Sequence, residues 1–494
     1  MFEEEKLTLS DLYFGDLEAY DEAVLHPEFF SDTFVQPISM SAKQLKNNGK
    51  FIVVGRKGAG KTAVQMRLAN DLHSKGYLTL FFRFFDEMKP SDYTEITKTQ
   101  SHISYAEAID SSKIFLHYDY RAAWERIFFN KMAEMFRENG IENAFTKFCA
   151  PQSSRISRLL QGISKSLRIK LSVDAIAAAA EVDFDLKELG GSDEITLEQH
   201  NVVARELFRS KCFDKRVYFF VDELVFSRID ATEDEIRVRA AMVRDIIRTC
   251  RELNTIAAIQ DIDIHFICSL RPEVRSMINE LDSEIGKTID GRDLTLEWLS
   301  SDGDENTLLD EVFFRKVSAS QSQAVKIDDF VCDSIRFGKS KMTLSEFLKT
   351  NTWGRPRDVV RLLQSIGKAS PRSDRIGEDE IKSGLDEYSR TSLKELFDEL
   401  GVVLGGQISV ALRRGINRKT YRNKHAFWRE IGEYLPGLSM EPTIDELFQL
   451  GVIQGYLPDP ARYFAAHRGE SYLKEHYQIR IHPALWNELG IRSV

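Results

Sequence analysis

Residues 55–62 have the types and spacing of a site that binds phosphate. They read GRKGAGKT and fit the pattern G-x-x-x-x-G-K-[ST]. The glycines let the backbone turn tightly and point its N–H groups at phosphate oxygens. Lys61 would neutralise the β- and γ-phosphates of a nucleotide, and the Thr62 hydroxyl would ligate Mg²⁺. The candidate binding residues are Gly55, Arg56, Lys57, Gly58, Ala59, Gly60, Lys61, Thr62 and Ala63.

A second candidate group lies in residues 217–223, which read VYFFVDE. Five apolar residues run into two acids, the form of a buried strand that carries carboxylates at its end. Asp222 could hold Mg²⁺ through water, and Glu223 could orient and deprotonate an attacking water. Taken alone, this pattern is more common at the surface end of a strand; behind a phosphate-binding loop, the catalytic interpretation is favoured.

A third candidate group follows residues 264–270, which read IHFICSL and predict another buried strand. Ser269 and Arg271 stand at its end, where a polar side chain can sense a γ-phosphate. The alternative is that Ser269 only caps the next turn. Further on, residues 353–358 read WGRPRD and open a helix, with proline in its first turn. Arg355 and Arg357 there need acids, phosphates or water as partners; the alternative is a solvated basic turn.

The elements around these groups predict how they are positioned. Residues 51–54 form a short apolar run typical of a buried strand, and residues 63–72 have helical spacing. A further strand over residues 77–85 completes a β-α-β unit. An incidental glycine-rich turn is the alternative for residues 55–62, and this strand–loop–helix setting argues against it. We expect an α/β fold with the parallel-sheet core of a P-loop NTPase.

The rest of the chain predicts four parts. Residues 1–49 would form an N-terminal arm, and residues 50–300 the core, with residues 86–200 as an insertion. Residues 301–375 would form a helical lid. Residues 376–494 end in helices followed by a predicted β-hairpin, which suggests a winged-helix-like α+β domain.

One basic segment stands out in this acidic chain. Residues 410–429 contain seven Lys or Arg, no acid, and interleaved aromatic residues. This composition favours a surface for DNA or RNA, with Arg418 and Lys419 as the first residues to test. The alternative is a helix face neutralised by acids of the same protein, and the sequence leaves both open.

Charge, cysteine content and hydrophobicity indicate the compartment in which the chain is expected to function. The net charge is −10, with 43% hydrophobic and 29% charged residues, so no overall attraction to nucleic acid or anionic membrane is implied. Five scattered cysteines without C-x-x-C spacing favour a reducing compartment without a structural metal site. We find no signal segment and no apolar run long enough to span a bilayer. A cytoplasmic protein without a membrane partner is therefore expected.

Five segments together resemble a known family. They are FGDLEAYDE at 14–22, GRKGAGKT at 55–62, FFVDEL at 219–224, GRPRD at 354–358 and LGVIQGY…IRIHPALW at 450–486. The chain is similar to bacterial P-loop ATPases of the AAA+ and STAND type, which have an additional strand and a catalytic Glu and are often encoded near phage-defence genes.

The resemblance implies ATP and Mg²⁺ as ligands, and Arg355 or Arg357 as a lid-borne sensor. Glu223, Lys61, Ser269, Arg271 and Arg357 are then the candidate catalytic residues, with Thr62 and Asp222 at the metal. LVFSRID at 224–230 departs from the family because no basic residue follows the acid pair directly. No arginine-finger position can be matched, so activation within a homo-oligomer stays open.

These observations favour an ATP-hydrolysing molecular switch that controls a partner, expected to be a defence effector encoded nearby. The chain contains no recognisable nuclease, protease, deaminase or NADase constellation. The alternative is a nucleic-acid-binding ATPase resembling replication initiators or transposition regulators. A small-molecule kinase would not need Glu223, and a scaffold that binds ATP without turnover is a further alternative.

Overall fold

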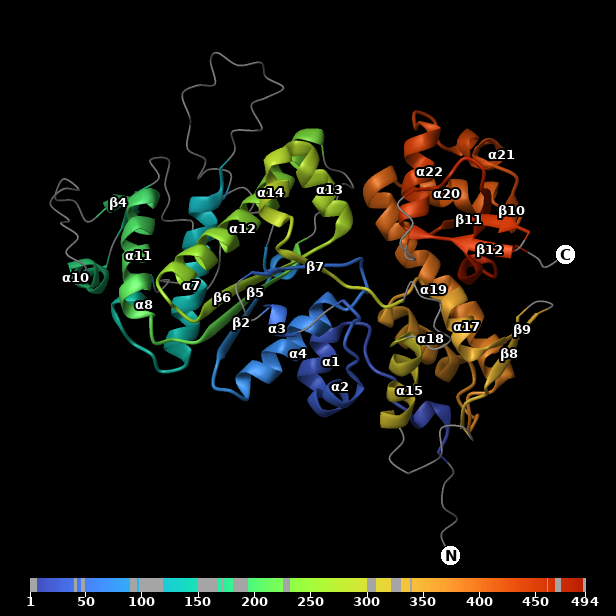
Figure 1. Cartoon of the computed structure of the whole chain (residues 1–494), viewed down its shortest axis with the longest axis horizontal. Helices are drawn as coiled ribbons and strands as arrows, with labels where there is room; N and C mark the ends of the chain where they lie inside the picture. The colour runs from blue at the N-terminus through green and yellow to red at the C-terminus, as the bar shows by residue number, and fades with distance from the viewer. Residues whose placement is uncertain are drawn as a thin grey trace, which may run out of the picture.

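A computed structural model gives the fold of the chain. It describes residues 7–39, 42–45, 49–88, 96, 119–149, 168–170, 172–180, 194–224, 232–299, 308–320, 330–337, 340–459, 461–466 and 472–491. A sheet with helices on both faces makes up one half of the molecule, and the lid and C-terminal domain make up the other (Figure 1). The N-terminal arm lies between the two halves.

Five parallel strands form the central sheet. They are β1 (Ile52–Val54), β2 (Leu78–Arg83), β5 (Val217–Leu224), β6 (Ile264–Leu270) and β7 (Asp293–Thr295), in the order β2-β5-β6-β1-β7. Strand β6 therefore separates the strand before the glycine-rich loop from the strand that ends in the acid pair. The predicted α/β core of a P-loop NTPase is confirmed, and this additional strand brings Ser269 between the two.

Helices cover both faces of the sheet because its strands are apolar on both sides. Tyr218 and Phe220 pack toward α4 (Lys61–His73), whereas Phe219 and Val221 pack with α7 (Arg121–Glu138) and α12 (Glu233–Ile259). This alternation is the period of two expected for a strand buried on both faces. After β6, the chain continues through α13 (Pro272–Leu281), η5 (Ser283–Ile285) and α14 (Gly286–Ile289) to β7.

The predicted insertion contributes to the core as well as to the surface. The strand expected over 77–85 ends at Arg83, and α5 (Phe84–Glu87) follows it. Helix α7 then packs on α12 and on α8 (Ala144–Cys149), and shares their hydrophobic core. The remaining described elements are β3 (Arg168–Lys170), α10 (Val173–Ala180), β4 (Glu194–Thr196) and α11 (Leu197–Lys211). Much of the insertion expected over 86–200 lies outside the described residues.

The N-terminal arm joins the two halves. It comprises η1 (Leu9–Asp11), α1 (Ala19–Leu25), α2 (Pro27–Thr33) and α3 (Ala42–Leu45). Phe30 packs with Met66 of α4, and Leu9 and Phe14 pack into the core of the other half. The arm is therefore fixed by both halves and runs along the boundary between them.

The lid is built from α15 (Leu308–Ser320), β8 (Ser334–Phe337), β9 (Ser340–Thr343), α17 (Leu344–Asn351) and α18 (Pro356–Ala369). A long helix, α19 (Glu378–Leu404), packs along α18 and leads into the C-terminal domain (Figure 1). A single hydrophobic core runs through the lid and the C-terminal domain, from Leu309 to Ile491. The two parts therefore form one packed body.

The C-terminal domain has a winged-helix-like order of elements. Helix α20 (Gln407–Gly415), β10 (Thr420–Tyr421), α21 (Lys424–Ile431), η6 (Gly432–Tyr434) and α22 (Met440–Gln449) come first. Strands β11 (Ile453–Pro458), β12 (Ala461–Phe464) and β13 (Gln478–Ile481) follow, then η8 (Pro483–Leu485). The strands form an antiparallel sheet in the order β10-β13-β11-β12. Segment 410–429 is therefore two short helices joined by a strand.

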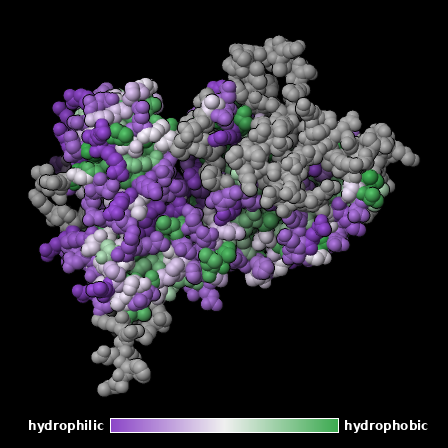
Figure 2. Space-filling model, turned by 180° about the vertical axis from the view of Figure 1, so that it is seen from behind, coloured by the Kyte–Doolittle hydropathy of each residue, from purple (hydrophilic) through white to green (hydrophobic). Residues whose placement is uncertain are grey.

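The surface of this half is mainly hydrophilic when seen from behind, with only small apolar areas (Figure 2). Among the residues that the structure describes, no helix is long and apolar enough to cross a membrane.

Candidate nucleotide-binding site

The glycine-rich loop has the backbone that its sequence predicts. Gly58 and Gly60 have φ angles of +79° and +87°, and α4 begins at the next residue, Lys61. A Cβ atom on Gly58 would lie 3.0 Å from the Cβ of Arg357, so the lid leaves no room for a side chain there. The loop therefore presents its backbone and the N-terminus of α4 to a common cavity.

Lys61 lies inside this loop. Its Nζ donates hydrogen bonds to the carbonyl oxygens of Gly55, at 2.8 Å, and of Arg56, at 3.1 Å. Burial lowers the pKa of Lys61 to about 8, and the positive charge of Arg271 adds to this decrease. Among the described residues, no carboxylate pairs with Lys61, so an anion in the cavity would be stabilised by pairing with it.

Three oxygen-bearing side chains meet at the carboxyl ends of the strands. Asp222, 1% exposed, accepts a hydrogen bond from the Thr62 hydroxyl at 2.6 Å and another from the Ser269 hydroxyl. Ser269 thus bonds the acid of β5 rather than the next turn. Hydroxyl and carboxylate oxygens are ligands that Mg²⁺ prefers, so Thr62 and Asp222 fit a magnesium ion completed by phosphate and water oxygens.

Glu223 has the least ordinary geometry of the site. Its φ angle is +57°, in the left-handed region, and the pairing of β5 with β6 shifts register between Val221 and Leu224. Its Oε2 atom is buried and has no hydrogen-bond partner in the part of the chain that the structure describes. Burial raises the pKa of the Glu223 carboxyl, and the charge of Asp222 adds to the increase. A carboxylate with this environment can accept a proton from water within the cavity.

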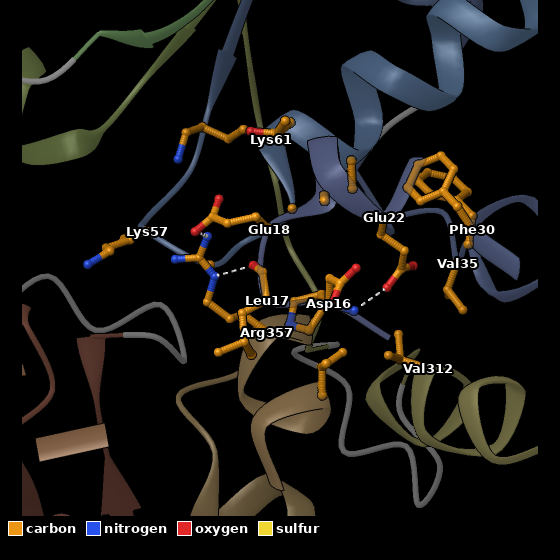
Figure 3. A pocket seen from close by; sticks show the side chains of 18 of the residues that line it. Asp16, Leu17, Glu18, Glu22, Phe30, Val35, Lys57, Lys61, Val312 and Arg357 are labelled. Atoms are coloured by element: carbon orange, nitrogen blue, oxygen red, sulfur yellow. Dashed lines mark hydrogen bonds and ion pairs between the residues drawn. The ribbon is translucent and has the colours of Figure 1, made fainter. Parts of the chain in front are cut away.

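The cavity lies where the loop, the strand ends, the arm and the lid meet (Figure 3). Of the candidate loop residues, Gly55, Arg56 and Ala59 are not in its wall. The loop residues in the wall are Lys57, Gly58, Gly60, Lys61, Thr62 and Ala63; the other candidates that line it are Asp222, Glu223, Ser269, Arg271 and Arg357. The catalytic and metal candidates are therefore brought together from four separate segments of the chain.

The two lid arginines have different positions. Arg355 is 5% exposed and makes a two-bond contact to Asp358, at 2.8 and 2.9 Å, while its Nη1 donates to the Lys57 carbonyl at 3.1 Å. Arg355 therefore contacts the loop from outside the cavity. Arg357 lines the cavity and pairs with Glu18 at 3.1 Å and with Glu395 at 3.2 Å. Neither guanidinium belongs to a solvated turn.

The end of the cavity away from the phosphate loop is apolar. Phe30 and Val35 of the arm and Val312 of α15 lie there (Figure 3), and Val360 of α18 also lines the cavity. None of these four residues belongs to a sequence motif, although the aromatic residues among the acids of the N-terminal arm favour packing of the arm beside the nucleotide site.

Two further contacts were not predictable from motifs. The Trp298 indole donates to the Ala59 carbonyl at 2.9 Å and packs against Gly60. Glu22 of α1 and Lys316 of α15 form a buried ion pair in the cavity wall, and Glu22 also accepts from the Asp16 amide at 2.7 Å. The arm is therefore attached to the lid beside the cavity.

Comparisons with known proteins agree with parts of this description. A family model described as the FunZ-associated C-terminal helical domain matches residues 306–397, which cover the lid and the first part of α19. No curated protein matches the sequence.

Two solved structures are similar at low identity. Cdc6p from Pyrobaculum aerophilum is 12% identical, with a TM-score of 0.35, and the Aeropyrum pernix ORC2 protein in ADPNP–ADP complexes is 11% identical, with a TM-score of 0.41. Each match covers 93% of this chain and 96% of the other. At these values the likeness does not say what this chain binds. The sheet order and the loop geometry by themselves define the class as a P-loop NTPase fold.

Proposed function

We propose that this chain is an ATP-hydrolysing molecular switch of the AAA+ and STAND type. The observation that carries the proposal is the hydrogen-bonded group of Thr62, Asp222 and Ser269 beside Glu223, whose Oε2 atom has no hydrogen-bond partner among the described residues. A carboxylate in this position suits activation of an attacking water, and transfer to a small-molecule substrate needs no water-activating Glu.

Hydrolysis would use these residues in defined roles. Thr62 and Asp222 would hold Mg²⁺, which neutralises charge on the β- and γ-phosphates when bound. Lys61 would exchange the Gly55 and Arg56 carbonyls for phosphate oxygens. Glu223 would accept a proton from the attacking water while the water oxygen bonds the γ-phosphorus. The bond between the γ-phosphorus and the bridging oxygen of the β-phosphate would break, leaving ADP and phosphate.

The opposite end of the cavity would hold the nucleotide base. Its walls, Phe30, Val35, Val312 and Val360, come from the arm and the lid, so a bound base would contact both halves of the molecule. That placement supports a switch, because closure of the lid would depend on the occupant of the cavity.

The partner belongs to the same proposal. The resemblance supports a protein effector encoded nearby in anti-phage defence, and we extend this to a cytoplasmic switch that assembles with that effector or with copies of itself. The proposal predicts measurable ATP hydrolysis by the purified chain.

The direct experiment compares the wild type with Lys61→Ala. Calorimetry should show nucleotide binding by the wild type and loss of most ATP affinity in the variant, with thermal melting unchanged. A folded Lys61→Ala chain that binds ATP normally would show that the ATP-binding site is not at residues 55–62.

A second candidate function is nucleic-acid binding by the C-terminal domain. Several basic side chains of 410–429 are neutralised: Lys424 pairs with Glu441 and Glu475, and Arg413 pairs with Glu488. Helix α22, the third helix of the winged-helix-like order, carries three acids and no base. These contacts disfavour binding of duplex DNA through that helix.

Another surface of the same domain favours nucleic acid. Lys419 lies 4.2 Å from the ring of Trp486, and Arg480 lies 3.9 Å from the ring of Tyr463, which stacks on Tyr456. Burial lowers the pKa of Lys419, and the charge of Arg480 adds to this decrease. Tyr463 is exposed, Lys419, Tyr456 and Trp486 are half-buried, and Arg480 is buried beneath them. Aromatic rings beside a cation suit the bases and phosphates of a single strand.

The test measures binding of single-stranded and duplex DNA at low salt, together with the ATPase rate in their presence. Replacing Arg418 and Lys419 by alanine should weaken binding and flatten the salt slope by roughly 0.7–0.9 per lost phosphate contact. Arg413→Ala is the control, because Arg413 pairs with Glu488 at 3.2 Å, closer than the 3.7 Å contact of Arg418 with Glu430. No binding by the wild type would leave segment 410–429 as a self-neutralised surface.

A further inference from the structure

Helix α19 presents two carboxylates to the phosphate loop. Glu395 and Glu399 stand one helical turn apart, and the ammonium group of Lys57 lies 3.2 Å from the first and 3.7 Å from the second. The side chains of the two glutamates are only 10% and 13% exposed. Since Lys57 belongs to the loop at 55–62, the two acids connect α19 to the nucleotide site.

The two acids differ in how well they are neutralised. Glu395 also pairs with Arg357, at 3.2 Å, and with Arg361. Although burial opposes it, these cations hold the pKa of Glu395 well below its usual range. Within the described residues, Lys57 is the one cation within 4 Å of Glu399, and the Oε1 of Glu399 has no hydrogen-bond partner. Burial raises the pKa of Glu399.

A bound triphosphate would compete for the same lysine. Lys57 lines the cavity, and its loop wraps the position of the phosphates. The charge of a triphosphate is several times that of one carboxylate, so Lys57 would gain by turning toward it. Glu399 would then be a buried charge without a cation, which is costly unless the helix that carries it moves.

We propose that Lys57 and Glu399 form a latch through which α19 senses nucleotide in the cavity. This inference rests on the proposed function, because it needs phosphates at the loop. In the absence of nucleotide, Lys57 holds α19 on the loop. Phosphates draw Lys57 away, and the Glu399 end of α19 loosens from the core half.

The position of α19 would transmit this movement to the C-terminal domain. The helix packs along α18 of the lid and contacts α20, α22 and η8 of the C-terminal domain. Side chains near its middle bond both parts: the Tyr388 hydroxyl donates to the Asn351 carbonyl at 2.8 Å, and Asp386 accepts from Asn487 at 2.9 Å. Displacement of α19 would therefore shift the C-terminal domain relative to the phosphate loop.

The test uses Glu399→Gln, which keeps the shape of the side chain and removes its charge. If the carboxylate competes with phosphate for Lys57, the variant should bind the slowly hydrolysed analogue ATPγS about 3- to 10-fold more tightly, as for a coupling of about 1 kcal/mol. Glu387→Gln is the matched control on the same helix, because Glu387 pairs with Lys368 on the surface. Its affinity should equal that of the wild type.

Hydrogen exchange provides a second measurement that needs no variant. In the wild type, ATPγS should speed amide exchange over residues 395–404, and in Glu399→Gln this response should be lost. Wild-type affinity in Glu399→Gln, or exchange over 395–404 that ATPγS leaves unchanged, would overturn the latch while leaving ATP binding intact. A wild type that binds no nucleotide would overturn the proposed function and the latch together.

Discussion

At the scale of single residues, Glu223 combines a left-handed backbone with a buried carboxylate oxygen that has no partner. Non-glycine residues adopt this backbone at a cost of roughly 1–3 kcal/mol, and such residues gather at functional sites. The register shift in β5 turns the Glu223 side chain out of the alternation of the strand and into the cavity.

Glu223→Gln should therefore bind ATP and hydrolyse it about 10²- to 10⁴-fold more slowly, because the amide cannot accept the proton of water. Single-turnover kinetics and calorimetry on the same preparation would separate binding from chemistry. Asp222→Asn is the informative comparison, since it should weaken the Mg²⁺ dependence instead. Normal turnover in Glu223→Gln would mean that another residue accepts the proton of the attacking water.

The lowered pKa of Lys61 predicts a pH dependence of binding. With a pKa of about 8, Lys61 is largely charged at pH 7 and largely neutral at pH 9. Bound phosphates favour the charged form, so ATP affinity should fall by up to roughly tenfold from pH 7 to 9. Binding near pH 8 should also take up protons, seen by calorimetry as a heat that changes with the ionisation enthalpy of the buffer. A buffer-independent heat would contradict this assignment.

The sequence predicted the residues of this site that belong to one contiguous pattern. Lys61 and Thr62 follow from the loop motif, and Asp222 follows from an apolar run that ends in acids. Trp298 and Phe30 could not be predicted, since their partners lie more than 30 residues away in sequence and neither belongs to a pattern with chemistry of its own. The positive φ angle of Glu223 could not be predicted either, because a glutamate, unlike a glycine, does not indicate a left-handed backbone.

At the scale of elements, the lid touches the phosphate loop through the start of α18. The Arg357 amide lies 3.4 Å from the Gly58 carbonyl, and its guanidinium is shared between Glu18 and Glu395. Arg357 can exchange either acid for a γ-phosphate, which ADP lacks.

Arg357→Ala should leave ADP affinity nearly intact and reduce the preference for ATP over ADP by about 1–3 kcal/mol. Dissociation constants for the two nucleotides give this difference directly. Arg390→Ala serves as the control, because Arg390 lies on the surface of α19 and pairs only with Glu387 among the described ion pairs. Equal losses for ATP and ADP would mean that Arg357 supports the fold rather than reading the γ-phosphate.

The junction between the lid and the C-terminal domain depends on one glycine. Trp353 donates to the Gly451 carbonyl at 2.8 Å and stacks on His482 at 4.3 Å. Gly451 has a φ angle of +78°, and a Cβ atom there would lie 2.5 Å from the Trp353 ring.

Gly451→Ala should therefore destabilise the chain in urea by more than the roughly 1 kcal/mol expected for the backbone alone. Gly437→Ala is a closely matched control, since Gly437 has a φ of +88° but nothing within 4 Å of the added carbon. Equal losses of stability in the two variants would show that the Trp353 ring can shift away from the added carbon without destabilising the chain.

Among the elements, strong periodicity was predictive. The helix expected over residues 63–72 is α4, Lys61–His73, and the helix expected to open at 353–358 is α18, Pro356–Ala369. The order of the strands was not specified by local pattern, because nothing in β6 itself says that it lies between β1 and β5. Segment 410–429 was treated as one basic stretch, yet its cations pair with different acids: Arg413 with Glu488, and Lys424 with Glu441 and Glu475.

At the scale of the whole molecule, the cavity is shared by the two halves. Its walls come from the core, the arm and the lid, whereas the lid and the C-terminal domain share one hydrophobic core. The lid and C-terminal domain should therefore unfold together.

A nucleotide bound in the cavity should stabilise both halves. At a concentration 100 times its dissociation constant, ATPγS should add about 2.7 kcal/mol. Calorimetric scans should show every resolved transition moving upward with ligand. Lys61→Ala should show no shift under the same conditions. Stabilisation of only one transition would mean that the bound nucleotide contacts only one half.

The buried pair of Glu22 and Lys316 also has a consequence for synthesis of the chain. Its members are 294 residues apart. At translation rates of about 5–20 residues per second, Glu22 leaves the ribosome roughly 15–60 s before Lys316. During that interval the aromatic residues around α2 have no lid to cover them, and the apolar end of the cavity does not exist. A nascent chain would thus be able to complete its phosphate loop long before it could enclose a nucleotide.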